Sequence, residues 1–309
     1  CDNARDKIQE ALENYGVDIH FITGGTLTNL TFLSHALRPY EAVISADTGH
    51  INTHETGAIE ASGHKVLSIP CTDGKLTADL IRPVLKQHEN EHWVEPRLVY
   101  ISLPTELGTV YTKEELEKLY QFCKRHNLYL YIDGARLAMA LAVEETQLTL
   151  KDLPDLCDAF YIGGTKNGAM FGEALILVND DLKDHFRFNM KQRGAILAKG
   201  WMIGVQFEEL FQDNLYLELG KRSVALAQRL KQGFIDCKIP FLCDSPTNQL
   251  FPIFPNEFAK KINENYVTTF QCKPDENHTC LRFCTSWATN EQAVEDFIKD
   301  LKQWSYIYA

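Results

Sequence analysis

The chain has 309 residues, of which 45% are hydrophobic and 24% charged, a composition typical of a water-soluble globular protein of one or two domains. Its net charge of −11, without a cluster of basic residues, argues against a nucleic-acid partner. No apolar run is long enough to span a bilayer and no signal-peptide pattern is present, so we expect no membrane association.

The nine cysteines are scattered without a paired framework. Reduced thiols in a cytoplasmic protein explain them better than disulfides do. The chain starts at Cys1 within a polar, helical stretch, and we expect a preceding segment to be absent from this numbering.

Strands and helices alternate through the first two-thirds of the chain. The pattern predicts helices over residues 1–14, 26–36 and 78–88, and strands at Asp18–Ile22, 42–46, Lys65–Ile69, 158–162 and 174–178. The clearest unit is an apolar strand at 97–102, a helix that begins with a capping box at Thr112 and Glu115 and stops near Asn127, and a second apolar strand at 128–132. Strand, helix and strand with short joins imply a right-handed crossover and a parallel pair. Both strands are expected to be buried on both faces.

The pattern changes in the last third. A helical stretch over 182–210 and a helix over 221–234 precede short strands at 241–243, 249–254, 267–271 and 280–285, and a final helix at 290–304. This predicts an α/β protein with a mostly parallel sheet in a large domain of residues 1–215, and a smaller α+β domain of residues 216–309.

A loose C-terminal set of Cys272, His278, Cys280 and Cys284 invites a zinc interpretation. Cys280 and Cys284, however, alternate with apolar neighbours as packed strand residues do, and we predict no metal site.

Four polar features follow predicted strands, where ligands gather in open parallel sheets. The first is Gly24-Gly25-Thr26, a glycine turn into a helix whose free N–H groups suit a phosphate, although it is neither a P-loop nor a dinucleotide fingerprint. A plain turn explains it equally well.

The second and third features are an acid and an amine. Asp133 follows the strand 128–132, where a carboxylate could meet a protonated pyridine nitrogen and so keep the ring an electron sink. It could also simply cap the next helix. Lys166 follows the strand 158–162, where partial desolvation would lower the pKa of its amine and suit Schiff-base formation, although most lysines are solvated surface groups.

The fourth feature is His50, which follows the strand 42–46. It could stack on an aromatic cofactor or handle protons, or it could be an ordinary surface histidine.

With these residues in view, the sequence resembles the threonine aldolases and β-eliminating lyases, a family of pyridoxal-phosphate enzymes with the aspartate-aminotransferase fold (fold type I). The resemblance runs from Gly24 to Trp287 and rests on the segments 133–136 (Asp-Gly-Ala-Arg), 165–166 (Thr-Lys), 50–57, 104–109 and 281–283.

The resemblance implies a role for each of these residues. Gly25 and Thr26 would hold the cofactor phosphate and His50 would stack on the pyridine ring. Arg136 and Thr165 would also bind the cofactor. Asp133 would meet the ring nitrogen and Lys166 would carry the cofactor. Arg136 and Arg282 would grip the substrate carboxylate, because a guanidinium can bind it through two parallel hydrogen bonds.

The implied reaction is cleavage of the Cα–Cβ bond of a β-hydroxy amino acid such as threonine or allo-threonine, giving glycine and acetaldehyde, with His50 or a water it polarises as the base. β-Elimination or transamination of an amino acid is the alternative with the same cofactor, and a non-catalytic α/β phosphate-binding module is the alternative without one. The resemblance also implies a homodimer or homotetramer.

The chain departs from the family pattern in two ways. A segment that precedes Cys1 in relatives contributes to the substrate site. The stretch where relatives carry an arginine near the cofactor phosphate reads Gly-Ala-Ile-Leu-Ala-Lys-Gly at 194–200, and Lys199 is the expected substitute.

Overall fold

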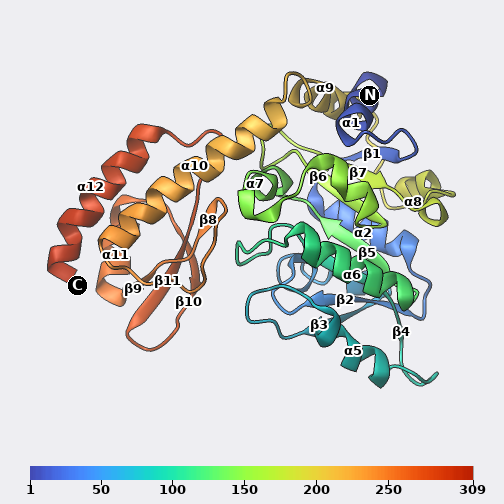
Figure 1. The fold of residues 1–309 in the computed structure, drawn as a ribbon, viewed down its shortest axis with the longest axis horizontal. Coiled ribbons are helices and arrows are strands. Elements are labelled where there is room, and N and C mark those ends of the chain that lie inside the picture. The colour runs from blue at the N-terminus through green and yellow to red at the C-terminus, as the bar shows by residue number, and fades with distance from the viewer. Residues whose placement is uncertain (309) are drawn as a thin grey trace.

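The computed structural model describes residues 1–308 and contains two β-sheets, each with its own helices (Figure 1). The larger sheet has seven strands in the order β1-β7-β6-β5-β4-β2-β3. Their bounds are β1 Asp18–Ile22, β2 Glu41–Ala46, β3 Lys65–Ile69, β4 Glu95–Ser102, β5 Tyr129–Asp133, β6 Ala159–Gly163 and β7 Glu173–Leu177. Only β7 runs against its neighbours β1 and β6; the other pairs are parallel.

Helices cover both faces of this sheet, because its inner strands are apolar on both sides. In β5, for example, Leu130 and Ile132 join one buried core while Tyr131 joins the other. One core packs against α1 Asp2–Leu12, α5 Ala78–Gln87, α6 Lys113–Arg125, α7 Leu137–Leu141 and α9 Trp201–Leu210. The other packs against α2 Gly25–Ala36, α3 His50–Thr53, α4 Ala58–Ala61 and α8 Phe186–Gln192. Short 3₁₀ turns lie at Glu144–Thr146, Leu150–Asp155 and Asp180–Leu182.

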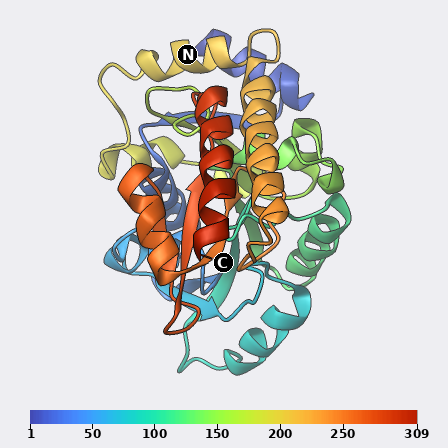
Figure 2. The same ribbon diagram turned by 90° about the vertical axis from the view of Figure 1, so that its left-hand side faces the viewer.

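The smaller, C-terminal part has its own core beneath a helical layer. Figure 2 shows α10 and α12 side by side on its outer face. The elements are α10 Leu215–Asp236, β8 Gln249–Leu250, β9 Ile253–Pro255, α11 Asn256–Asn265, β10 Thr269–Cys272, β11 His278–Cys284 and α12 Glu291–Tyr308. Helix α10 belongs to both parts, since Tyr216 packs in the large core and Leu230 in the small one. The domain boundary after residue 215 stays a prediction.

The local patterns are largely confirmed. The capping box at Thr112 is present, with the Thr112 side chain accepting from the Glu115 amide and the Glu115 carboxylate accepting from the Thr112 amide. The parallel pairing of β4 with β5 is also present. All nine cysteines are free thiols. Among residues 1–308, no helix combines the length and the apolar character needed to cross a membrane.

Four predictions of local structure were wrong. The single strand predicted at 249–254 is two short strands, β8 and β9. The helical stretch 182–210 is interrupted between α8 and α9, where Gly194 adopts a φ of +75°. No strand forms at 241–243, where Phe241 makes a single bridge to Pro252. The strand predicted at 267–271 is β10, which begins two residues later; Val267 is fully exposed.

Candidate functional site

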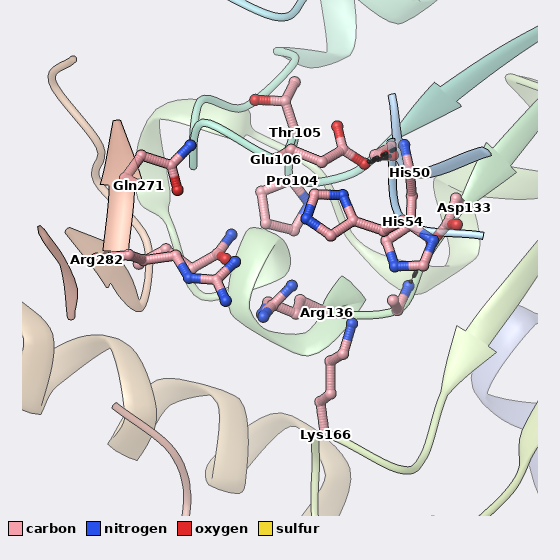
Figure 3. A pocket seen from close by; sticks show the side chains of 13 residues that line it. His50, His54, Pro104, Thr105, Glu106, Asp133, Arg136, Lys166, Gln271 and Arg282 are labelled. Atoms are coloured by element: carbon pink, nitrogen blue, oxygen red, sulfur yellow. Dashed lines mark hydrogen bonds between the residues drawn. The ribbon is translucent and has the colours of Figure 1, made fainter. Parts of the chain in front are cut away.

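A cavity of about 210 Å³ lies between the carboxyl ends of the large-sheet strands and the small sheet (Figure 3). The parallel strands β4, β5 and β6 end at Ser102, Asp133 and Gly163, so the residues that follow them reach one edge of the sheet. The small sheet contributes the opposite wall. The lining residues are His50, His54, Ser102, Pro104, Thr105, Glu106, Asp133, Ala135, Arg136, Lys166, Gln249, Gln271 and Arg282. The fold therefore brings together His50, Asp133, Arg136, Lys166 and Arg282, which are up to 232 positions apart in the sequence.

Asp133 is the last residue of β5 and is buried. One carboxylate oxygen accepts hydrogen bonds from the Tyr100 hydroxyl at 2.6 Å and the Asn29 amide at 3.1 Å. The other accepts from the Ala135 backbone at 3.0 Å. Three donors fix the orientation of this carboxylate. It is thus held rigidly at the cavity wall.

His50 begins the short helix α3. Its Nδ1 donates to the buried carboxylate of Glu55 at 2.8 Å, and its backbone amide donates to Glu106 at 2.9 Å. Burial lowers the pKa of His50, but the hydrogen bond to Glu55 and the charge of Asp133 outweigh it, and the pKa is raised above its ordinary value. The ring is therefore held in a fixed orientation beside Asp133, with a tendency to be protonated.

Lys166 follows β6 and projects into the cavity (Figure 3). Burial lowers the pKa of its amine, and the neighbouring Arg136 guanidinium lowers it further. Asp133 and Glu173 act in the opposite direction without cancelling this effect. A lysine with a lowered pKa has more of the neutral amine that attacks a carbonyl carbon.

The remaining predicted site residues lie outside the cavity lining. Gly25 and Thr26 begin α2, which has no side-chain cap, and Gly25 lies close enough to Tyr161 that a Cβ there would be 3.1 Å from its hydroxyl. Thr165 donates to Glu173 at 2.8 Å. Lys199 is exposed, in the segment between α8 and α9.

Eight cavity residues were not predicted as site residues, among them His54, Glu106, Gln249 and Gln271. Glu106 accepts from Ser102 at 2.6 Å, and burial raises its pKa to about 7. A buried carboxyl cannot be recognised from a loop sequence. His54 did carry a signal, because it lies four residues after His50, a spacing that puts two side chains on one helical face.

Two residues of the small-sheet wall have buried polar atoms without a protein partner. Within residues 1–308, both polar atoms of the Gln249 side-chain amide and Nε of Arg282 are buried and have no hydrogen-bond partner. Buried polar atoms are normally hydrogen-bonded. Unpaired donors and acceptors beside an amine and a carboxylate suit a polar ligand that occupies the cavity and completes these bonds.

Comparison with known proteins gives consistent matches. Residues 3–254 match the family model described as β-eliminating lyase. The chain is 29% identical over 297 residues to the low specificity L-threonine aldolase of Pseudomonas aeruginosa and 31% identical to that of a Pseudomonas species, in each case over 92% of this chain and 82% of the relative.

Solved structures match over almost the full length. A Leishmania major threonine aldolase superposes with a TM-score of 0.97 at 50% identity, over 99% of this chain and 89% of the other. An aminotransferase from Staphylococcus aureus superposes with a TM-score of 0.71 at 13% identity, over 100% of this chain and 85% of the other, and shares the fold.

Proposed function

This chain belongs to the β-eliminating lyase family, and we propose from that premise that it is a pyridoxal-phosphate-dependent aldehyde lyase of the threonine aldolase type. Its substrate is a β-hydroxy amino acid such as threonine or allo-threonine, and its products are glycine and an aldehyde. The proposal rests on one observation: Lys166 and Asp133 line the same cavity, together with Arg136 and Arg282.

The residues of the cavity fit the cofactor. When bound, pyridoxal phosphate supplies a positively charged ring that accepts the electron pair released from the substrate. Lys166, with its lowered pKa, would be the amine for covalent attachment, and the Asp133 carboxylate would hold the protonated ring nitrogen. His50, whose Nδ1 donates to Glu55, would lie against the ring. The uncapped start of α2, with Gly25 and Thr26, offers N–H groups for the phosphate, and Thr165 lies beside Lys166.

The two arginines that line the cavity would bind the substrate. Arg136 follows β5 and Arg282 lies on β11, so the carboxylate would be held between the large and the small sheet. The unpaired Nε of Arg282 is a donor that such a carboxylate would satisfy. Holding the carboxylate orients the Cα–Cβ bond relative to the ring, which is the main contribution of the protein to this kind of cleavage.

We also propose that the chain assembles as a homodimer or homotetramer. Support comes from large apolar side chains that are exposed in the segment 170–205, which includes Met170, Phe188, Trp201 and Val205 with 54–88% of their surface accessible. Exposed apolar side chains concentrated in one segment are typical of protein–protein contacts. Lys199 lies in the same segment. Sedimentation analysis tests this, and a monomer at micromolar concentration would contradict it.

Product analysis with threonine and with serine tests the reaction. Glycine and acetaldehyde from threonine support the lyase proposed here. Keto acid and ammonia would indicate β-elimination, and a keto acid formed only with an amino acceptor would indicate transamination.

Substitution of Lys166 tests whether the cofactor is used at all. The purified protein is expected to be yellow, and Lys166→Ala to abolish both the lysine-linked absorbance and the cleavage. Borohydride reduction of the wild type should leave cofactor on Lys166. A colourless wild type with no trapped cofactor would indicate a non-catalytic module.

A further inference from the structure

We propose that His54 is the base that removes the β-hydroxyl proton of the substrate, and that Thr53 is a positioning residue that directs the lone pair of His54 Nε2 into the cavity. This inference rests on the proposed function and names the residue that performs one of its steps. It replaces His50 in the role expected for it from the sequence.

The hydrogen bonds of Thr53 determine which nitrogen of His54 carries the proton. The Thr53 hydroxyl oxygen lies 3.1 Å from the carbonyl oxygen of Gly49 and 3.4 Å from that of Thr48. Carbonyl oxygens can only accept, and a Thr53 hydroxyl that gives its single proton to the backbone keeps its oxygen free to accept. The same hydroxyl oxygen lies 2.6 Å from His54 Nδ1.

In the proposed arrangement the imidazole of His54 donates the contact to Thr53. With the hydroxyl proton already used, Thr53 can only accept, and Nδ1–H donates to it. A neutral imidazole carries one proton, so Nε2 is left as an acceptor. His54 lines the cavity (Figure 3), and its Nε2 can therefore accept a proton from a bound ligand.

The surroundings of His54 keep it neutral. Burial lowers its pKa, and four basic groups lower it further: His50 at the start of the same helix, and Arg282, Lys166 and Arg136 from other elements. A base must be unprotonated before it can act, and His54 meets this condition near neutral pH.

His50 is suited to the complementary role. The two rings are stacked, with centroids 5.4 Å apart and planes inclined by 16°. His50 donates to Glu55 and its pKa is raised, whereas the pKa of His54 is lowered. When the pKa values of two neighbouring groups are shifted in opposite directions, the group with the lowered pKa is the better base. His54 is therefore the group that accepts the proton, and His50 is left to lie against the ring.

The step balances. The O–H bond of the β-hydroxyl group breaks and its proton passes to His54 Nε2. The O–H electron pair becomes the second bond of the aldehyde carbonyl group as the Cα–Cβ bond breaks, and the Cα–Cβ pair is taken up by the electron sink. A proton delivered to Cα, from His54 or solvent, completes glycine, and no oxidant or reductant is needed.

The test compares two reactions of the holoenzyme. Threonine cleavage needs removal of the hydroxyl proton, whereas exchange of the glycine α-hydrogen with D₂O does not. His54→Phe keeps an aromatic ring but has no base. Its kcat for threonine cleavage is expected to fall by roughly 10²–10⁴-fold, and the pH profile of cleavage should lose its acidic limb. The rate of glycine exchange should stay within about threefold of the wild type. His50→Phe is the matched control and should retain that acidic limb.

Two outcomes would overturn the assignment: cleavage by His54→Phe within tenfold of the wild type with the same acidic limb, or equal loss of both reactions. A wild type that exchanges glycine but cleaves no β-hydroxy amino acid would overturn the proposed function, and the assignment with it.

Nuclear magnetic resonance tests the tautomer without any turnover. In the ¹⁵N-labelled protein, His54 should show a protonated Nδ1 and an unprotonated Nε2 at pH 7.5. Thr53→Val removes the acceptor at nearly constant volume, and should shift the ring towards Nε2–H and lower kcat about fivefold. Thr53→Ser keeps the hydroxyl group and should change neither. A protonated Nε2 in the neutral ring of the wild type contradicts the proposal.

Discussion

The two walls of the cavity treat buried polar groups differently. At the edge of the large sheet, the Asp133 carboxylate accepts three hydrogen bonds from the protein. On the small sheet, both amide atoms of Gln249 and Nε of Arg282 are buried without a protein partner within residues 1–308. The Asp133 carboxylate is fully hydrogen-bonded before any ligand arrives, whereas Gln249 and Arg282 leave polar atoms for a ligand to satisfy.

This difference indicates that the two walls have different functions, one in holding the cofactor and the other in binding the substrate. A group that must hold a cofactor in one orientation benefits from a network that is already formed, because nothing needs to reorganise when the ligand binds. Groups that bind and release substrate in every turnover benefit from being unpaired, because the ligand then replaces no protein hydrogen bond. Substitutions on the first wall should therefore affect chemistry and stability, and those on the second should affect mainly substrate binding.

The largest effect is expected for Asp133→Asn. The amide has the same shape but no negative charge to keep the ring nitrogen protonated, so kcat should fall by roughly 10²–10³-fold. Steady-state cleavage of threonine and the absorption spectrum of the bound cofactor measure it. A fall of less than threefold would show that this wall does not tune the cofactor.

Asn29→Leu should cause the next largest effect, this time on stability. The buried Asn29 amide donates to Glu55 and Asp133, and its oxygen accepts from Tyr131. Leucine leaves two carboxylates and a phenol with fewer partners, which should lower the free energy of unfolding by about 3 kcal/mol. Urea unfolding of the cofactor-free protein measures this, and an unchanged midpoint would contradict the view of a preformed wall.

Arg282→Lys should weaken substrate binding by about tenfold while changing stability little. Lysine keeps the charge but loses the planar fork that binds a carboxylate through two hydrogen bonds. KM for threonine should rise while kcat changes less. Arg229→Lys on α10, at an exposed ion pair with Glu295 of α12, is the control and should leave KM unchanged.

The smallest effect is expected for Gln249→Leu, and its sign is opposite to that of Asn29→Leu. Removing a buried amide that has no partner should raise the stability of the cofactor-free protein by about 1 kcal/mol, at the expense of substrate affinity. The same urea experiment checks it. If both leucine variants were destabilised equally, the contrast between the walls would be wrong.

Periodicity and strand-end chemistry led to three of the residues that line the cavity, His50, Asp133 and Lys166. Asp133 and Lys166 were predicted to share one ligand because each follows an apolar strand in a parallel sheet, and both line the cavity. Gly25 and Thr26 were predicted from the same reasoning, but they start α2 outside the cavity lining, so their contact with a phosphate stays a proposal. The role of every site residue likewise awaits the experiments above.

What the sequence determined by itself is the local structure and the family: apolar periodicity sets which segments become strands and helices, and short motifs at strand ends identify the relatives. Tertiary structure alone decided the reversed direction of β7, the break between α8 and α9, and the opposite pKa shifts of His50 and His54. The physical reason is the distance along the chain over which each effect acts. Propensity acts between neighbours along the chain, whereas the pKa of a side chain depends on burial and on charges that folding brings close from distant positions.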